Sequence, residues 1–523
     1  MKKYLVILVV VVLALTISFV GCKATTAETT AAAAETTAAA AETTAAAAET
    51  TAAGEVKPFT LDDIPEIKNK APLNTMFESG TMFDEMIPVF KAFAEKTGVQ
   101  INIERIATPV MYAKENVELV AGTGVYDLPM VETAWTDEWA QYLIPLEELA
   151  AKYDSVEALN ASIATQAPAI LTTCKTDGKL LCIPLYTYQC SMILRQDIFD
   201  DPTEQAAFKE KYGYDLKPAT TPDQLYDQEE FFTRKKGELL KGKPLEQELY
   251  GMSMMASAYQ DNDEMSTYLW GNGGDYVDVI KDDSGKVIEY QITKENNDLM
   301  IKTMKQYVER VKLASPGCLT ANFDFIVGSL GEGSSVIAGH LYANCFKWAT
   351  DVLKTGAGAA DPDARLGIYP TVGEVAPRPY TGGYAFAVSK ETKNEEAAYW
   401  LIRWIGSYEA QKAVMTAAGQ LSTRLDVISD PEWTTPENAY PFAPLVDYLK
   451  FVYTNKDYEQ FLDNEYYFNS ASGGKVTEMH MNMLAKGMSG ELSPEDCIAS
   501  INQQMIDLVT KFDTVPIKDL SNE

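Results

Sequence analysis

The chain has 523 residues and a formal net charge of −31 at pH 7. Such an excess of acids excludes a protein that binds nucleic acid or an anionic lipid surface through bulk charge, because both surfaces are negative themselves. Hydrophobic residues make up 46% of the chain, and the length exceeds what one core supports, so we expect two sizeable lobes.

The first 21 residues are predicted to be a secretory signal peptide. A short basic head, MKKY, precedes the apolar run LVILVVVVLALTISFV, which is too short for a typical membrane span. The run ends in Gly21-Cys22 and resembles the lipobox of bacterial lipoproteins, although Phe19 stands where Leu is usual. The resemblance implies that Cys22 is lipidated and holds the protein on the outer face of the cell membrane. An ordinary secretory peptide or an uncleaved anchor is the alternative.

Residues 22–57 are predicted to be a low-complexity tether of Ala, Thr and Glu. Glu28, Glu35, Glu42 and Glu49 recur every seven residues, but no large apolar side chain is present to fill a coiled-coil interface. A tether of this length spans roughly 30 Å as a coil and about 45 Å as a helix. Either form would hold the body clear of the lipid head groups.

The body begins with strands and helices in alternation. The pattern predicts strands at 73–77 and 99–103, helices at 82–96 and 111–121, and a loop and strand over 122–133. This βαβαβ order indicates an α/β fold with a mostly parallel sheet flanked by helices. Ligands of such sheets bind beyond the carboxyl ends of the strands.

Further elements are predicted along the rest of the chain. Asp177-Gly178 indicates a hairpin between strands 171–173 and 180–182. Thr293 and Ser493 are predicted helix caps. Strands are expected at 289–292, 365–369 and 384–388. Helices are expected from the Thr293 cap to Val311, at 394–404, at 409–419, and from the Ser493 cap to Phe512.

No motif indicates catalysis, a metal or a cofactor. His340 and His480 are the only histidines, which makes a histidine-based metal site or nucleophile relay unattractive. The glycine-rich segments match neither the dinucleotide nor the phosphate-loop pattern. A glycoside-active enzyme needs only two carboxylates, so it remains the alternative, although nothing singles out a pair among 75 acids.

Six cysteines follow Cys22, and three of them, Cys174, Cys182 and Cys190, are evenly spaced. The spacing does not match a metal site. A two-residue turn would place Cys174 opposite Leu181, whereas a three-residue turn would allow a Cys174–Cys182 disulfide. A Cys318–Cys345 disulfide is a second possibility, and buried thiols are the alternative for all six, including Cys497.

Aromatic residues recur near glycines and predicted loops, as in ETAW, LYTY, YLWGNGG and TGGY. Flat rings suit the apolar face of a sugar, and neighbouring polar groups suit its hydroxyls. Core packing is the alternative role for each ring.

Four segments in order carry a resemblance to a known family: AGTGVYDLPMVETAWTDEWAQYLIPLEEL, DGKLLCIPLYTYQCSMILRQDIF, TGGYAFAVSKETKNEEAAYWLIRWIGSYEAQ and QLSTRLDV. They resemble the family 1 extracellular solute-binding proteins of bacterial ABC importers, the group that includes the maltose-binding protein. The resemblance implies a class II-like, two-lobed periplasmic-binding-protein fold with hinge crossings. Lobe one would hold 72–186 and 371–423, and lobe two 187–370 and 424–523.

The resemblance also implies a function. We expect a monomeric, non-catalytic receptor without cofactor or metal, which captures a mono- or oligosaccharide between the lobes and delivers it to an ABC permease. A receptor for a peptide or another non-sugar solute is the alternative. The implied ligand-binding residues are Glu78, Ser79, Thr133, Trp135, Tyr186, Tyr188, Trp270, Asp275, Tyr342, Asn344, Gly383, Tyr384 and Arg424. We further expect Trp270→Ala to weaken binding more than folding.

Overall fold

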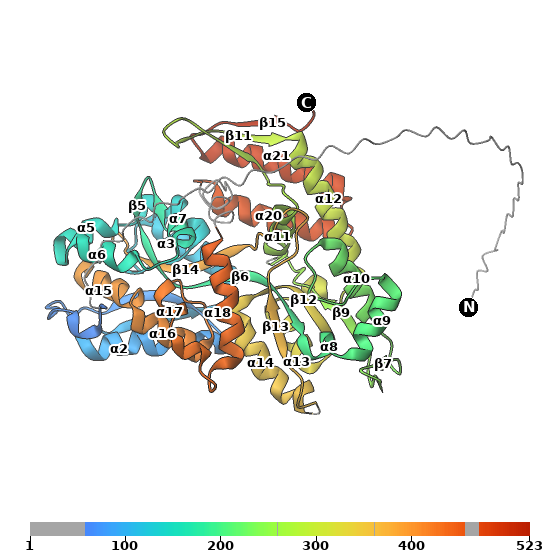
Figure 1. Ribbon diagram of the computed structural model, residues 1–523. Coiled ribbons are helices and arrows are strands. Elements are labelled where there is room, and N and C mark those ends of the chain that lie inside the picture. The colour runs from blue at the N-terminus through green and yellow to red at the C-terminus, as the bar shows by residue number, and fades with distance from the viewer. Residues whose placement is uncertain (1–57, 259, 360, 456–469) are drawn as a thin grey trace, which may run out of the picture. The chain divides into compact units, whose positions relative to one another are not determined.

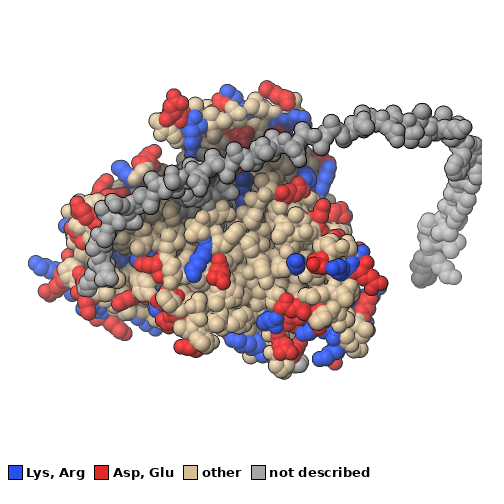
Figure 2. Space-filling view, in the orientation of Figure 1, with Lys and Arg blue, Asp and Glu red and all other residues tan. Residues whose placement is uncertain are grey.

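The computed structural model describes residues 58–523 except 259, 360 and 456–469. The signal peptide, Cys22 and the whole predicted tether lie outside the described residues, so those predictions stay predictions. Residues Val56–Glu523 form one compact unit. Figure 2 shows that acidic and basic side chains are interspersed on the visible face of this unit.

The N-terminal elements follow the predicted βαβα order. Strand β1 (Leu73–Glu78) pairs in parallel with β2 (Ile101–Ile106). The expected helix at 82–96 is divided into α1 (Thr81–Asp84) and α2 (Ile87–Thr97). Pro88 explains the division, because proline lacks an N–H and is tolerated in the first turn of a helix but not inside it. Gly98 ends α2 in the left-handed conformation, with φ of 70°.

Strand β6 (Cys182–Arg195) is the longest strand described and belongs to two halves of one sheet. Its first half pairs with β14 (Thr381–Ala387), and β14 pairs with β3 (Met130–Glu132). Its second half pairs with β12 (Ser335–Tyr342) and β13 (Leu366–Tyr369), and β12 pairs with β9 (Tyr250–Ser253). One strand therefore joins the two halves, as Figure 1 shows.

The prediction of mostly parallel sheets is corrected by these pairings. β14, β12 and β13 all run antiparallel to β6, and only β12–β9 is parallel within the described six-stranded sheet. The physical reason is the chain path. The chain passes from one half to the other along β6 and returns along β14, so the two neighbouring strands point in opposite directions.

Helices cover both halves of the sheet (Figure 1). Those around the first half are α3 (Thr108–Ala121), α4 (Thr136–Trp139), α5 (Leu146–Tyr153), α6 (Val156–Ile163), α7 (Pro168–Thr173), α15 (Glu395–Ile405), α16 (Tyr408–Ala418) and α17 (Leu425–Ile428). Those around the second half are α8 (Gln196–Phe199), α9 (Pro202–Tyr212), α10 (Pro222–Phe232), α13 (Phe323–Glu332), α14 (Phe346–Thr355) and α18 (Ala439–Thr454). The predicted helices at 394–404 and 409–419 are confirmed as α15 and α16.

A further group contains the sheet β10 (Asp278–Lys281), β11 (Val287–Thr293) and β15 (Ile517–Leu520). Its helices are α11 (Asp261–Gly271), α12 (Lys294–Val311), α20 (Gly473–Met488) and α21 (Pro494–Phe512). Thr293 caps α12 by accepting a hydrogen bond from the Asn296 amide at 3.4 Å, and Ser493 caps α21 by accepting one from the Asp496 amide at 3.1 Å. Both predicted caps are confirmed.

Short elements complete the described chain. They are β4 (Lys175–Thr176), β5 (Lys179–Leu180), β7 (Leu239–Leu240), β8 (Lys243–Pro244), and the 3-10 helices η1 (Leu61–Asp63), η2 (Thr133–Trp135), η3 (Ala140–Tyr142), η4 (Cys318–Thr320), η5 (Ala343–Cys345), η6 (Ala357–Ala359) and η7 (Pro431–Thr434). Within the described ranges, no helix is both long enough and apolar enough to cross a bilayer.

The hairpin has the two-residue Asp177-Gly178 turn, with positive φ at both positions, and pairs Thr176 with Lys179. The Leu181 amide donates to the Cys174 carbonyl at 3.0 Å, so Cys174 lies opposite Leu181 and not Cys182. The six cysteines of the described chain are buried free thiols. Neither the Cys174–Cys182 nor the Cys318–Cys345 disulfide is formed, and the alternative of buried thiols holds. The expected strand at 171–173 is wrong: these residues end α7, whose first residue is Pro168.

Candidate ligand-binding pocket

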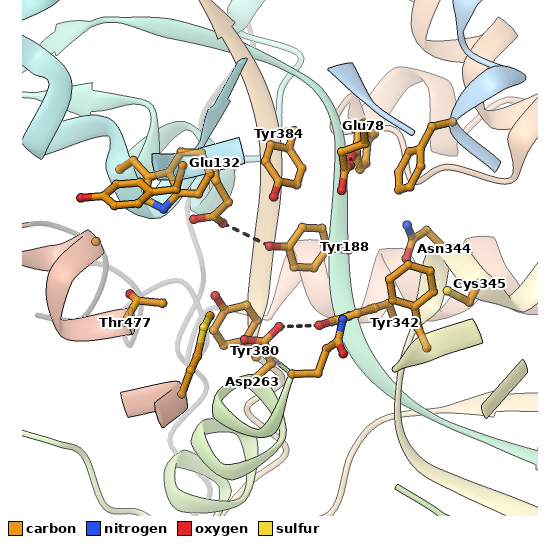
Figure 3. Close-up of a pocket in the computed structure, with 18 of the residues that line it drawn as sticks. Glu78, Glu132, Tyr188, Asp263, Tyr342, Asn344, Cys345, Tyr380, Tyr384 and Thr477 are labelled. Atoms are coloured by element: carbon orange, nitrogen blue, oxygen red, sulfur yellow. Dashed lines mark hydrogen bonds between the residues drawn. The ribbon is translucent and has the colours of Figure 1, made fainter. Parts of the chain in front are cut away.

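A pocket lies where the end of β1, the β3–η2 junction, β6, β14, α11, η5 and α20 converge (Figure 3). Its empty volume is about 1050 Å³, part of which is open to solvent. This is the size of a typical small-molecule site. The lining residues are Glu78, Met82, Phe83, Tyr112, Ala113, Glu132, Trp135, Tyr186, Tyr188, Gln260, Asp263, Phe323, Tyr342, Asn344, Cys345, Tyr380, Tyr384, Gly474, Thr477, Glu478 and Met481.

Strands β6 and β14 bring a group of tyrosines to the pocket. Tyr186 and Tyr188 alternate along β6 and both line the cavity, as residues two apart on a strand share a face. The Tyr188 ring meets the edge of Tyr342 at a centroid distance of 5.0 Å and stacks near Tyr380 at 6.4 Å. Gly382, paired with Tyr188, makes room for this ring, because a Cβ there would lie 2.4 Å from the Tyr188 side chain.

Glu132 approaches the pocket from the end of β3. Its Oε2 accepts a hydrogen bond from the Ala134 amide at 3.0 Å, and its Oε1 accepts one from the Tyr188 hydroxyl at 3.2 Å. Only 6% of the residue is exposed. Burial, with a smaller contribution from the negative charge of Asp263, raises the pKa of Glu132 to about 8, although its hydrogen bonds lower it.

Asp263 lies in the first turn of α11, on the other side of the cavity (Figure 3). The Tyr342 hydroxyl donates to its Oδ2 at 2.6 Å, and the Asn262 amide donates to its Oδ1 at 3.3 Å. Burial raises the pKa of Asp263 to about 7, although these hydrogen bonds lower it. The two carboxyls therefore titrate near neutral pH in the unliganded pocket.

Two further polar groups line the cavity. Glu78, at the carboxyl end of β1, accepts a hydrogen bond from the Tyr186 hydroxyl. Asn344, in η5, donates through Nδ2 to Gln420 at 2.8 Å. Its Oδ1 is buried and has no hydrogen-bond partner among the described residues, and the residue is 4% exposed. A buried acceptor without a partner is costly, and a water or a ligand that donates at this wall would remove that cost.

Helix α20 contributes a wall that the sequence did not suggest. Gly474, Thr477, Glu478 and Met481 line the cavity. A Cβ at Gly474 would lie 2.7 Å from Glu138 and 2.9 Å from Tyr112, so glycine allows close approach. The glycine pair in SGGKVT is the only signal of this contact, and it does not identify the partner.

Seven of the thirteen residues predicted for the site line this one pocket: Glu78, Trp135, Tyr186, Tyr188, Tyr342, Asn344 and Tyr384. Sequence reasoning missed the two acids opposite each other, Glu132 and Asp263, and the ring of Tyr380. Glu132 and Tyr380 are sequence neighbours of predicted residues, but Asp263 is one acid within DNDE and carries no distinguishing signal.

The other six predicted residues lie outside the pocket lining. Ser79 is exposed, Thr133 is buried, and Gly383 pairs with Thr187 inside the sheet. Arg424 forms an ion pair with Asp426 at 2.6 Å and donates to the Gly406 carbonyl at 2.9 Å.

Trp270 and Asp275 are engaged with each other. The Trp270 indole donates to Asp275 Oδ1 at 3.1 Å, and its fully buried ring stacks near Tyr380 at 6.0 Å. The structure thus places Trp270 in the core behind a pocket residue.

The comparisons with known proteins agree with this architecture. Residues 88–441 match the family described as bacterial extracellular solute-binding protein. A maltose-bound protein from T. maritima is 18% identical, with 84% of this chain and 100% of that chain covered and a TM-score of 0.62. An ABC transporter solute-binding protein from Agrobacterium radiobacter, solved with ribitol, is 17% identical, with 84% and 99% covered and a TM-score of 0.63.

A third similar structure is the GacH receptor of Streptomyces glaucescens, solved without ligand and with acarbose. It is 17% identical, with 85% of this chain and 100% of that chain covered and a TM-score of 0.61. At these identities the structures show the fold alone, and the predicted α/β, two-lobed periplasmic-binding-protein class is confirmed. The family match covers well over half of the chain, and the chain belongs to the bacterial extracellular solute-binding proteins.

Proposed function

We propose that this protein captures a carbohydrate in the pocket beside β6 and delivers it to an ABC importer permease. The observation that carries the proposal is the lining itself. Aromatic rings from four separate segments, including Trp135, Tyr188, Tyr342 and Tyr384, surround a cavity that also contains buried carboxylates. Such rings suit the apolar faces of sugar rings, and the carboxylates suit hydroxyl groups.

The similar structures support a carbohydrate or polyol as the solute. Those proteins were solved with maltose, ribitol and acarbose, respectively. These ligands share many hydroxyl groups on a small carbon skeleton. The pocket volume of about 1050 Å³ leaves room for a mono- or oligosaccharide.

The proposed lobes are 72–186 with 371–423, and 187–370 with 424–523. β6 crosses between them, and the Thr187–Leu421 bridge brings a second crossing beside it. Glu132 would then belong to lobe one and Asp263 to lobe two, so a ligand that contacts both stabilises the closed form. A closed form that differs from the open one is what a permease would recognise.

The site of action follows from the N-terminal sequence. We propose that Cys22 is lipidated after removal of residues 1–21, and that 22–57 tether a monomeric body outside the cytoplasmic membrane. Labelling cells with a lipid precursor tests this directly. A Cys22→Ser variant should lose the lipid and leave the membrane fraction.

Two measurements test solute capture. Native mass spectrometry of the purified protein should detect a copurified carbohydrate, and a thermal-shift screen of sugars and polyols should find a ligand. At 100 times its dissociation constant a ligand adds about 2.7 kcal/mol to the free energy of unfolding. No response from any sugar or polyol would contradict the proposal, and hydrolysis of a glycan by the purified protein would favour an enzyme with two carboxylates instead.

A further inference from the structure

Most of the polar side chains that line the pocket end in oxygen, and Gln260 adds a side-chain amide that can donate. The hydroxyls of Tyr186, Tyr188 and Tyr342 donate to Glu78, Glu132 and Asp263, respectively. The Asn344 amide donates to Gln420, and the Thr477 hydroxyl donates to the Gly473 carbonyl at 3.0 Å. What these residues leave for a ligand is carboxylate, hydroxyl and amide oxygen.

The charge of the lining is one-sided. Glu78, Glu132, Asp263 and Glu478 are acidic, and none of the described residues that line the cavity is Lys or Arg. The nearest described cation on the α20 wall, Lys475, forms an ion pair with Glu138. Glu132 and Asp263 are buried, and no described Lys or Arg pairs with either of them. Such carboxylates are costly when ionised, and an incoming positive charge removes that cost.

The aromatic rings favour the same chemistry. Tyr188, Tyr342, Tyr380 and Tyr384 lie around the space between Glu132 and Asp263 (Figure 3). The face of a tyrosine ring carries a negative quadrupole and attracts an ammonium group. An ammonium also carries several donors and no acceptor, which matches the oxygen atoms of Glu78, Glu132 and Asp263.

From this lining we propose that the solute is an amine-bearing carbohydrate, whose ammonium group sits between Glu132 and Asp263 and whose hydroxyls meet Glu78 and Asn344. The buried Asn344 oxygen, which has no hydrogen-bond partner among the described residues, offers an acceptor to a ligand hydroxyl at this wall. The inference rests on the proposed carbohydrate function and specifies its substrate class.

The test compares matched neutral and cationic probes by isothermal titration. The pairs are glucose with glucosamine, galactose with galactosamine, and sorbitol with N-methylglucamine, and N-acetylglucosamine serves as the substituted but uncharged control. We expect the amine to bind at least about tenfold more tightly than its neutral partner in one or more pairs, which is about 1.4 kcal/mol. The preference should weaken as salt increases.

Two isosteric variants identify the groups responsible. Glu132→Gln and Asp263→Asn should each reduce the affinity for the amine at least about tenfold more than the affinity for its neutral partner. Asp283→Asn, an exposed acid in the β10–β11 turn, is the matched control and should leave both affinities unchanged. Circular dichroism and melting of each variant establish that it is folded before binding is interpreted.

The number of protons released on binding is a further test, because it would not depend on Glu132 and Asp263 if their role were only structural. The groups that face Glu132 and Asp263 are Tyr188 and Cys190 on β6, Tyr342 on β12, Tyr380 and Tyr384 at β14, and Asp261 on α11. A bound ammonium ionises the two carboxyls, whose pKa values of about 8 and about 7 leave Glu132 mostly protonated and Asp263 about half protonated at pH 7. Titration in two buffers of different ionisation enthalpy at pH 7 should show protons released with N-methylglucamine and fewer with sorbitol.

The outcomes separate the two proposals. Equal or tighter binding of the neutral member in every responding pair would overturn the amine assignment and leave carbohydrate capture standing. Equal loss of both members in Glu132→Gln and Asp263→Asn would also overturn it. No binding of any probe or of any sugar in the wider screen would overturn both.

Discussion

The hydroxyl of Tyr188 donates to Oε1 of Glu132 at 3.2 Å, and this bond joins the strand that crosses between the sheet halves to the end of β3. Removing the hydroxyl with Tyr188→Phe keeps the ring and its contact with Tyr342. We expect a loss of about 1 kcal/mol in the free energy of unfolding. The pKa of Glu132 should rise, because this hydrogen bond holds it down.

Chemical denaturation and carboxyl-detected NMR titration measure the two effects of Tyr188→Phe. Tyr214→Phe is the control, since Tyr214 also donates to an acid, Asp227, at 2.9 Å but lies outside the pocket lining. An unchanged Glu132 pKa in Tyr188→Phe would show that the bond is absent in solution.

Glycine at position 382 is required by the Tyr188 ring. In Gly382→Ala the added Cβ would lie 2.4 Å from ring atoms of Tyr188, which is held between Tyr342 and Tyr380. We expect a loss of about 1–3 kcal/mol in stability and a loss of ligand affinity as the ring moves. Gly328→Ala in α13 has no neighbour within 4 Å and should gain up to about 1 kcal/mol, because alanine is the better helix former.

Trp270→Ala should damage folding first. The side chain is fully buried and lies outside the pocket, so its removal leaves a large cavity that costs about 3–5 kcal/mol. This reverses the expectation from sequence that binding suffers more than folding. Thermal melting measures the stability of the variant, and calorimetry measures its ligand affinity. An unchanged melting temperature with a lost affinity would show that Trp270 contacts the ligand.

The stability of the ligand-free protein should fall as the pH rises from about 5 to about 8. The folded pKa values of Glu132 (about 8) and Asp263 (about 7) lie above their ordinary values of 4.5 and 3.8. The folded state therefore holds protons that the unfolded state has already lost, and this stabilisation disappears as the folded carboxyls ionise. Buried Glu229 and Glu264, with pKa values raised to about 7 and about 8, act in the same direction.

Urea unfolding at a series of pH values measures this dependence. The change should be on the order of a few kcal/mol, and Glu132→Gln should flatten the curve because glutamine does not titrate. Asp283→Asn, at an exposed turn, should reproduce the parent curve. A stability that increases toward pH 8 would contradict the raised pKa values.

The thiols should react only after unfolding. Cys174, Cys182, Cys190, Cys318, Cys345 and Cys497 are all buried and free. A thiol reagent should label none of them at an appreciable rate in the native protein and all six in denaturant, without prior reduction. A protected pair in the denatured, unreduced protein would indicate a disulfide.

Local order was predictable from sequence because it depends on neighbouring residues. Asp177-Gly178 predicted a turn, although its length of two residues came from the structure, and Thr293 and Ser493 cap their helices through contacts within one turn. The alternation of β6 likewise placed Tyr186 and Tyr188 on one face. The failure at 171–173 has a local cause too, since the helix that Pro168 begins was overlooked.

The family and its general architecture could also be predicted from the sequence, because four family motifs occur in the chain in the expected order. Which residues meet at the pocket depends on tertiary structure. Glu132 and Asp263 are far apart in the chain, and they line one cavity only because β6 pairs with β14 on one half and β12 on the other. Burial at that junction raises their pKa values, and no sequence pattern encodes burial created by distant segments. Trp270 lies in the core for the same reason. Its residue type alone was compatible with ligand binding or with core packing, and the tertiary structure decided between them because it removes this side chain from water.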